Sequence, residues 1–381
     1  MPESSPGILG GLSTARFLSD YWQKAPCLVR AALAGYTPAL DGDDLAGLAC
    51  EEEAESRLVS GRYPGRHWTL RHGPFSERDF ARLPDSDWAL LVQDVEKHYP
   101  PLQELLSRFD FLPAWRLDDL MISYAAPGGS VGPHVDQYDV FLLQMQGQRL
   151  WQIARDFDPT LLADCPLSVL ENFEPEQEWI LKPGDMLYLP PGVAHHGVAL
   201  DECMTGSVGL RAPTAADLLL ALGEELGARE DGGPRYSDPD LQTLPPGKID
   251  AEALERVRRL ITGTVSEPDS FAEFAGRFIT CFGLSKEPAN PNPDLTAPEL
   301  LERMQAGVRL VRNPWTRLAW VERDQSALLF AAGHTVSCSR RLAALLCAEI
   351  EPDLFSAPLA DADLAAVVEL LNQGHLVLAS N

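Results

Sequence analysis

The sequence predicts an α+β protein in which an antiparallel β-barrel is followed by helices and by a small mixed domain. Three observations support this prediction. Short apolar runs broken by Gly and Pro fill residues 118–212, a pattern typical of barrels and sandwiches. Apolar residues take helical spacing after Pro213, and two loop-like stretches divide the remainder of the chain. The 381 residues are enough for two or three domains.

Residues 1–212 are predicted to form one domain with the barrel as its main part. Between Phe17 and Trp22 apolar residues recur at helical spacing, and PCLVRAAL predicts a short buried strand. From LMISYAA at 120–126 onward, strand-like runs alternate with turns such as PGGS, PGD and PPG. Because the runs are short and closely spaced, neighbouring strands are expected to pair in antiparallel fashion.

Residues 213–285 are predicted to be mostly helical. Thr214 followed by Asp217 predicts a helix N-cap with an acidic first turn. Apolar stripes predict two further helices, around 254–261 and 271–278. The stretch DGGPRYSDPDLQTLPPGK is rich in Gly, Pro and Asp, and it predicts a loop between the first and the second of these three helices.

The last domain is predicted to span 286–381, and the linker SKEPANPNPD at 285–294 leads into it. Its pattern is a helix, two strands, two helices and the final strand HLVLAS, an order that suits a winged-helix-like domain. From residue 297 onward it has seven arginines and ten acidic residues. That balance argues against DNA binding, so a structural or interaction module is expected.

The acidic composition narrows the range of partners. The chain has 31 Lys and Arg against 56 Asp and Glu, a net charge of −25, which repels nucleic acid and attracts basic partners. Solubility or a salt-adapted host explains the charge equally well. No apolar run approaches the roughly 18 residues that span a bilayer, and the N-terminus lacks a basic segment before an apolar core. We therefore expect a cytoplasmic protein without membrane contact.

A candidate metal site begins at Gly132-Pro133-His134-Val135-Asp136. Residues i and i+2 of a strand face the same side, so His134 and Asp136 are expected to project together into the barrel. An imidazole and a carboxylate are two-thirds of the 2-His-1-carboxylate set, which suits Fe(II) and leaves positions open for a cosubstrate and oxygen. The seven cysteines include no CxxC pair, so they predict neither a disulfide framework nor a thiolate zinc site.

The third ligand is predicted from a second motif, which starts at Gly184. Pro190, Gly192 and His195 follow with the spacing G-x5-P-x-G-x2-H of the cupin barrels, or double-stranded β-helices. Pro and Gly make a tight turn, after which the histidine re-enters the barrel on the next strand. Adjacent strand residues face opposite sides, so only one of His195 and His196 points inward, and the motif spacing favours His195.

The residues around these motifs resemble a known family. HVDQYDVFLLQ, GQRLWQI and GDMLYLPPGVAHHG are similar to segments of the JmjC-type ribosomal oxygenases, particularly their bacterial branch. FLSDYWQKAPCLVRAAL, DDLMISYAAPGGSVGPHVDQYDVF, SVGLRAP and RYSDPD extend the resemblance over about residues 17–240. HxD alone is generic to this oxygenase superfamily, whereas the extended HVDQYDVF and RYSDPD segments are more specific.

The resemblance implies a fold, an activity and cofactors. It implies a JmjC jelly-roll catalytic domain at 1–212, helices at 213–285 through which two copies form a homodimer, and a winged-helix domain at 286–381. Such enzymes use Fe(II), 2-oxoglutarate and molecular oxygen to hydroxylate a ribosomal protein. In the bacterial branch the target is an arginine of a large-subunit ribosomal protein, hydroxylated at its β-carbon. The implied iron ligands and catalytic residues are His134, Asp136 and His195.

The resemblance also implies a cosubstrate site. Arg149 matches the arginine that grips the distal carboxylate of 2-oxoglutarate, and a guanidinium binds a carboxylate through two hydrogen bonds. An exposed strand arginine is the alternative. Ser123 lies in the matching strand and is expected to add a hydrogen bond. Thr205 departs from the pattern, because bacterial relatives often have Asn near the cosubstrate at this position.

Three positions match those that hold the target side chain in the bacterial branch, namely Asp119, Met121 and Tyr138. An acidic group beside an aromatic face suits a guanidinium. The alternatives are a cap at the end of the barrel for Asp119 and core packing for the other two.

Three rival hypotheses remain open on the sequence alone. One keeps the chemistry and changes the target to histidine hydroxylation or demethylation, although the acidic Asp119 favours arginine. Another is a metal-binding cupin of another class, such as an isomerase or a dioxygenase of small molecules, and Arg149 as an anchor for 2-oxoglutarate discriminates against it. The third is a ribosome-associated binding protein without activity, against which the intact ligand triad argues.

Overall fold

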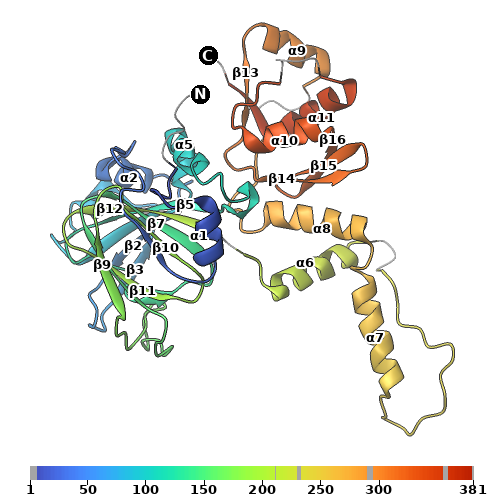
Figure 1. The fold of residues 1–381 in the computed structure, drawn as a ribbon, viewed down its shortest axis with the longest axis horizontal. Coiled ribbons are helices and arrows are strands. Elements are labelled where there is room, and N and C mark those ends of the chain that lie inside the picture. The colour runs from blue at the N-terminus through green and yellow to red at the C-terminus, as the bar shows by residue number, and fades with distance from the viewer. Residues whose placement is uncertain (1–6, 211, 230–232, 290–294, 355–358, 380–381) are drawn as a thin grey trace. The chain divides into compact units, whose positions relative to one another are not determined.

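The computed structural model describes residues 7–210, 212–229, 233–289, 295–354 and 359–379. Two compact units divide the chain, at residues 1–212 and 213–381. In Figure 1 the first unit runs from blue to green and the second from yellow-green to red. Four predicted segments extend outside the described residues. They are the strand region 118–212 at residue 211, the loop at 231–232, the linker at 290–294 and the final strand at 380.

The first unit contains two antiparallel sheets that form a double-stranded β-helix, so the predicted fold is confirmed. In the described part of the chain, the order of the larger sheet is β1 (Cys27–Val29), β10 (Met186–Leu189), β7 (Asp139–Gln146), β12 (Cys203–Leu210), β5 (Asp119–Ala125), β4 (Trp88–Val92), β2 (Ser56–Ser60) and β3 (Thr69–His72). The order of the smaller sheet is β6 (His134–Val135), β11 (Ala194–Ala199), β8 (Arg149–Ala154) and β9 (Gln177–Leu181).

Strand alternation separates the barrel interior from a helix-covered face of the larger sheet. Along β7, Phe141 and Leu143 belong to the main apolar core, whereas Val140 and Leu142 line the barrel interior. Tyr188 of β10 joins the same core, and its ring lies 4.9 Å from that of Phe141. Each large apolar side chain buried in this way contributes about 1.5–3 kcal/mol.

Short helices cover this face. They are α1 (Thr14–Asp20), α2 (Gly42–Leu48), α4 (Val95–His98) and α5 (Gln103–Ser107), which contribute Phe17, Leu45, Val95 and Leu105 to the core. The predicted helix near Phe17 and the predicted strand in PCLVRAAL are confirmed as α1 and β1. The remaining elements are α3 (Glu77–Phe80) and 3-10 turns at Pro100–Leu102 and Ala114–Arg116.

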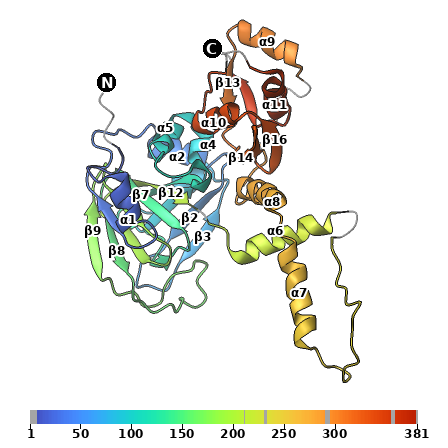
Figure 2. The ribbon, with the colours of Figure 1, turned by 45° about the vertical axis from the view of Figure 1, so that its right-hand side comes forward.

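The second unit begins with the predicted helices. They are α6 (Ala215–Gly227), α7 (Ala251–Gly263) and α8 (Pro268–Cys281). Thr214 caps α6 as expected, since its side chain accepts from the backbone N–H of Asp217, whose carboxylate accepts in return from Thr214. Phe274 and Phe278 of α8 pack with Leu222 of α6. In contrast, α7 extends away from α6 and α8 in both views (Figures 1 and 2), and none of its described side chains is buried.

The rest of the second unit differs in one respect from its prediction. After α9 (Ala297–Gln305) come four described strands rather than two: β13 (Arg309–Arg312), β14 (Leu318–Arg323), β15 (Ser326–Ala331) and β16 (His334–Cys338). Helices α10 (Arg340–Ala348) and α11 (Asp361–Asn372) follow, and β17 (Leu376–Ala379) pairs with β13.

The missed strands result from very short turns. Only two residues separate β14 from β15, and Ala332 and Gly333 alone separate β15 from β16. Both of these turn residues have positive φ, as the tightest hairpin turns require. The first turn lies within the polar run Glu322–Ser326 and the second is only two residues long, so neither has the length of an ordinary loop that would separate the strands in the sequence. Among the described residues, no helix is long and apolar enough to cross a membrane.

Candidate active site

The first metal motif lies on the shortest strand of the barrel. Gly132, which has a φ of 81°, turns the chain into β6 and brings the His134 ring back over its own backbone. The Nδ1 atom of His134 lies 2.9 Å from the carbonyl oxygen of Gly132. Asp136 follows directly after the strand, so the two side chains remain on the same side.

The second motif forms the turn between β10 and β11, which brings His195 opposite the first motif. Gly192, at a φ of 81°, donates its backbone N–H to the carbonyl oxygen of Asp136 over 2.8 Å. Strands β11 and β6 then pair so that His195 lies directly across from His134. This register carries the third ligand to the first two, although His195 follows Asp136 by 59 positions in sequence.

The three side chains converge on one point. His195 Nε2 lies 3.5 Å and His134 Nε2 3.9 Å from Asp136 Oδ2, and the centroids of the imidazole rings are 4.3 Å apart. One ligand atom from each residue lies within 4.8 Å of the others, and no second group of this kind occurs in the described residues. Three atoms at these separations can bind a single metal ion at about 2.0–2.2 Å each.

The hydrogen bonds of the imidazoles favour metal binding. Each Nδ1 faces a backbone carbonyl two residues earlier, at 2.9 Å for His134 and 3.0 Å for His195. A carbonyl only accepts, so each Nδ1 carries a proton, and in the neutral ring this leaves the lone pair on the Nε2 that faces Asp136. Burial, reinforced by the neighbouring His134, lowers the pKa of His195 below its ordinary value. Two neutral imidazoles and a carboxylate therefore fit a divalent cation.

His196 points to the opposite side of β11, as alternation requires. Its ring packs edge-on against Tyr63 and Phe173, with centroid distances of 5.5 and 6.1 Å. The Nε2 atom is buried without a hydrogen-bond partner among the described residues. Burial is the main reason that the pKa of His196 falls to about 4, so the ring is a neutral part of an aromatic cluster.

A cavity of about 380 Å³ opens beside the triad inside the barrel. Eight of the nine predicted site residues line it, and Thr205 lies just behind its wall. Those eight are Asp119, Met121, Ser123, His134, Asp136, Tyr138, Arg149 and His195. Two parts of the cavity carry charge of their own, one around Arg149 and one around Asp119.

Arg149 is held by neutral groups only. Arg149 is 6 % exposed, and no carboxylate in the described chain forms an ion pair with its guanidinium. Its Nη1 donates to Ser123 Oγ and to Thr205 Oγ1, each over 3.2 Å, while the Nε has no partner. Burial lowers the pKa of Arg149 below its usual range, although an arginine remains protonated. A buried cation without a counter-ion fits an anionic ligand in the cavity.

Gln144 fixes the direction of these hydrogen bonds. Its amide nitrogen donates to the carbonyl of Gln146 over 2.8 Å, so its Oε1 accepts from the Thr205 hydroxyl over 3.2 Å. With its proton engaged there, Thr205 has only lone pairs to offer Arg149. Thr205 and the fully buried Gln144 thus form the hydrogen bonds at this position together.

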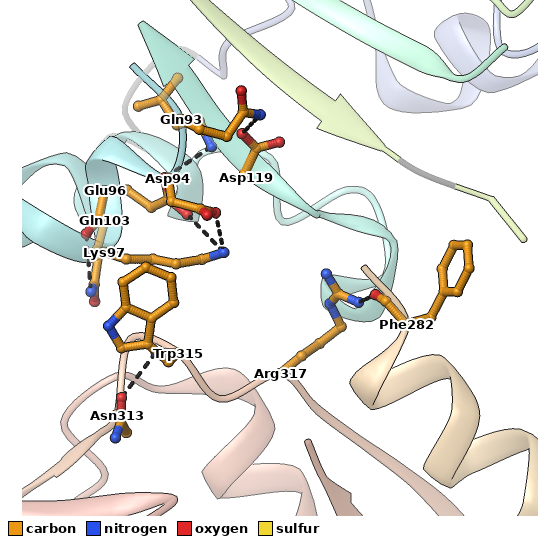
Figure 3. A network of polar contacts seen from close by, with 11 residues as sticks. Gln93, Asp94, Glu96, Lys97, Gln103, Asp119, Phe282, Asn313, Trp315 and Arg317 are labelled. Carbon is orange, nitrogen blue, oxygen red and sulfur yellow. Dashed lines mark hydrogen bonds and ion pairs between the residues drawn. The ribbon is translucent and has the colours of Figure 1, made fainter. Parts of the chain in front are cut away.

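Around Asp119, the segment that follows β4 supplies the neighbouring polar groups (Figure 3). Gln93 donates through Nε2 to Asp119 Oδ2 over 2.5 Å, and Glu96 accepts the backbone N–H of Leu120 over 2.9 Å. Lys97 forms an ion pair with Asp94 and lies 3.9 Å from Glu96. Burial, with Asp119 nearby, raises the pKa of Glu96 to about 8 despite Lys97.

Sequence reasoning missed four cavity or support residues: Arg57, Gln93, Gln144 and Trp151. Trp151 is two positions from Arg149 on β8, so strand alternation could have found it. Its ring lies 5.6 Å from the Arg149 guanidinium and 5.9 Å from the His195 ring. The other three have no local signal, because they reach the site from strands whose neighbours only the fold defines.

Comparison with known proteins agrees with the fold and the site. A family model described as the JmjC domain matches residues 104–218, and one described as the ROXA-like winged helix matches residues 259–377. The Ribosomal protein uL16 3-hydroxylase of Escherichia coli (strain K12) is 35 % identical over 367 residues, which cover 94 % of this chain and 96 % of that protein. Human Ribosomal oxygenase 1 is 36 % identical over 91 residues, which cover 22 % of this chain and 13 % of that protein.

Solved structures extend this likeness over the whole chain. The crystal structure of E. coli ycfD has a TM-score of 0.86 at 33 % identity and covers 97 % of this chain and 98 % of its own. The E. coli ribosomal oxygenase YcfD in complex with cobalt and 2-oxoglutarate has a TM-score of 0.85 at 33 % identity and covers 97 % of this chain and 99 % of its own.

A double-stranded β-helix with this ligand triad and a buried arginine in the same cavity defines a JmjC-type oxygenase. Within that class, the chain belongs to the ribosomal oxygenase family, as its similarity to the E. coli enzyme over 94 % of its length shows. The family expected from the sequence motifs is confirmed.

His195 faces the metal site and His196 faces away from it, so the same substitution should weaken metal binding at His195 but not at His196. His195→Phe removes a ligand, so the affinity for Co(II) should fall by roughly a hundredfold or more. His196→Phe keeps an aromatic ring against Tyr63 and Phe173 and should bind Co(II) like the wild type. Calorimetric titration of both variants measures this, and equal loss in the two would contradict the orientation of β11.

The raised pKa of Glu96 predicts a pH-dependent stability difference. A carboxyl whose folded-state pKa lies near 8 stabilises the fold fully below its unfolded pKa and loses that contribution as the pH rises through 8. Glu96→Gln keeps the acceptor for Leu120 and cannot ionise. The wild type should therefore lose stability relative to Glu96→Gln between pH 5 and pH 8.5, on the order of a few kcal/mol. Urea unfolding at both pH values tests this, and parallel behaviour of the two proteins would refute it.

Proposed function

We propose that this protein is an Fe(II)- and 2-oxoglutarate-dependent oxygenase that hydroxylates the β-carbon of an arginine in a large-subunit ribosomal protein. The observation that carries the proposal is that one cavity contains the metal triad, the buried Arg149 and the buried Asp119. An anionic cosubstrate and a cationic target side chain can thus both reach the metal. The E. coli relative is named as a 3-hydroxylase of uL16, and carbon 3 of an amino acid is its β-carbon.

His134, Asp136 and His195 would hold the iron in this proposal. Two imidazoles and one carboxylate leave open positions for the cosubstrate and for oxygen. Bound iron(II) supplies the activation of molecular oxygen. In the overall reaction one oxygen atom enters the C–H bond of the arginine, and the other enters succinate as 2-oxoglutarate loses CO2.

Arg149 is proposed to bind the distal carboxylate of 2-oxoglutarate, with Ser123 and Thr205 as its supports. Nη1 is engaged by the two hydroxyls, so the other guanidinium nitrogens are the donors left for a ligand. The hydroxyls also hold the guanidinium in place before the cosubstrate arrives. Pre-orientation of this kind reduces the entropy that binding must overcome.

Asp119, Met121 and Tyr138 are proposed to hold the target arginine. Asp119 is 7 % exposed and lines the cavity, so a guanidinium bound there would form a desolvated ion pair. Met121 and Tyr138 supply apolar and aromatic surface for the aliphatic part and the face of the guanidinium. A neutral imidazole would gain less from the carboxylate, which favours arginine over histidine.

The acidic charge of −25 supports a basic ribosomal protein as the partner, through electrostatic attraction. Ribosomal proteins are made in the cytoplasm, and we propose that compartment for the enzyme. Direct binding to nucleic acid is not part of the proposal, because a strongly acidic surface repels phosphate.

We further propose that residues 213–285 form the dimerisation region and residues 286–381 the winged-helix domain. Leu254, Val257 and Ile261 follow one face of α7 and are 59, 45 and 57 % exposed. An apolar stripe left open to this degree on a helix is typical of a surface that a second copy covers.

The decisive experiment combines purified protein, Fe(II), 2-oxoglutarate, oxygen and a panel of peptides from basic ribosomal proteins. The wild type should add one oxygen to an arginine, located by mass spectrometry, and His134→Ala should add none. Asp119→Asn should raise the peptide KM by about tenfold or more with the 2-oxoglutarate KM unchanged, and Arg149→Met should do the reverse. Oxidation of a histidine, of a small molecule only, or equally by His134→Ala would favour one of the rival functions.

The proposed dimer predicts a change of mass on substitution. Val257→Glu with Ile261→Glu places charge on the stripe and should convert a dimer into a monomer, as measured by light scattering after size exclusion. Arg259→Glu, on the opposite face of α7, is the control and should remain dimeric. A wild-type protein that is monomeric at micromolar concentration would overturn this assignment.

A further inference from the structure

A polar chain crosses three strands of the barrel beside the target end of the cavity. Residues at every second position face inward on these strands: Glu55, Arg57 and Val59 on and before β2, Ala89, Leu91 and Gln93 on and after β4, and Asp119, Met121 and Ser123 on β5. Within this inward face, Arg57, Gln93 and Asp119 form a line from a cation through an amide to a carboxylate.

The two contacts of Gln93 determine which way its amide points. Arg57 Nη2 lies 3.4 Å from Gln93 Oε1, and Gln93 Nε2 lies 2.5 Å from Asp119 Oδ2. A guanidinium can only donate and an ionised carboxylate can only accept. The amide oxygen must therefore face Arg57 and the amide N–H must face Asp119, since the flipped amide would place like groups together at both ends.

The backbone of this segment is also fixed. Gln93 donates its backbone N–H to the carbonyl of Glu55 over 2.9 Å, at the end of the β2–β4 ladder. Asp94 then takes a left-handed φ of 56°, which ends the strand and turns the chain into α4. As a result, Glu96 of α4 reaches the Leu120 N–H, so the residue after Asp119 is held through its backbone while Gln93 holds the carboxylate.

We propose that Gln93 is a positioning residue that sets the specificity for arginine, by orienting the Asp119 carboxylate, and that Arg57 acts by orienting Gln93. The inference rests on the proposed function, in which Asp119 receives a guanidinium. A carboxylate has about four lone-pair sites, so an amide donor at Oδ2 occupies one of them and fixes the plane of the carboxylate. The amide also stabilises the ionised form without the competing cation that a direct Arg57–Asp119 pair would place in the site.

The test uses an arginine peptide and the same peptide with citrulline, which has nearly the same shape and no charge. Gln93→Met, similar in length and unable to hydrogen-bond, should raise the arginine-peptide KM by about tenfold, and it should reduce the arginine-to-citrulline preference by a similar factor. Gln93→Glu should have a larger effect, because a second carboxylate then faces Asp119. The 2-oxoglutarate KM should not change in either variant.

A double-mutant cycle tests the role of Arg57. Arg57→Met alone should raise the arginine-peptide KM by a few fold, but should add nothing to Gln93→Met, since the amide that it orients is then gone. Gln152→Met and Arg71→Met are matched controls. Gln152 bonds an exposed carboxylate outside the cavity, Arg71 pairs with Asp79 on the protein surface, and neither substitution should alter the preference.

A purely structural role for Gln93 would lower the melting temperature without altering the preference for arginine over citrulline. If folded Gln93→Met keeps the wild-type preference while Asp119→Asn loses it, the inference is wrong and the proposed function stands. If the wild type oxidises no arginine peptide, both fall. If Gln93→Met is too unstable to assay, Gln93→Asn, which is too short to bridge Arg57 and Asp119, should show the same loss of preference, and an unchanged preference there would equally refute the inference.

Discussion

The pairing of β6 with β11 is the constraint on which the site depends. These strands place His134 and His195 directly opposite each other, and the Gly192 N–H bound to the Asp136 carbonyl holds the end of the pair in register. Side chains alternate along a strand, so a shift of one residue would bring His196 to the metal side and turn His195 toward Tyr63 and Phe173. A two-residue strand has little pairing energy of its own. The adjoining β11–β8 ladder, which pairs all six residues of β11, therefore supports it.

Two buried charges lie in the same cavity, and each of them accepts from or donates to a neutral group. Hydroxyls of Ser123 and Thr205 hold Arg149, and the Gln93 amide holds Asp119. A buried charge without any hydrogen bond would be costly, whereas a buried pair of opposite charges would have little left to offer a ligand. An amide or a hydroxyl that hydrogen-bonds to the charged group offsets part of its desolvation cost without neutralising it. The charge can therefore still interact with a ligand. This balance explains why Gln144 and Gln93, which carry no charge, matter for an anionic and a cationic ligand respectively.

The two parts of the second unit differ in how many of their apolar side chains are buried. Beyond α8, buried residues from its strands and helices form a continuous core around Leu329, Leu342 and Leu370. In contrast, α7 presents apolar residues to solvent and buries none. The difference is consistent with a domain that is stable by itself next to a helix that needs a partner surface.

The sequence by itself determined the barrel, its ligand triad and the family, because these depend on local spacing. Strand periodicity places His134 and Asp136 on one face. The Pro-Gly turn that precedes His195 can be recognised without knowing the order of the strands. The two-residue turns around β15 were missed, since turns of this length leave no loop-like stretch between the strands. Nor could the sequence identify Arg57, Gln93 or Gln144, which act on Asp119 or Arg149 through hydrogen bonds between neighbouring strands. Only the tertiary structure decides which strands are neighbours, and with them the hydrogen-bond partners that orient a buried charge.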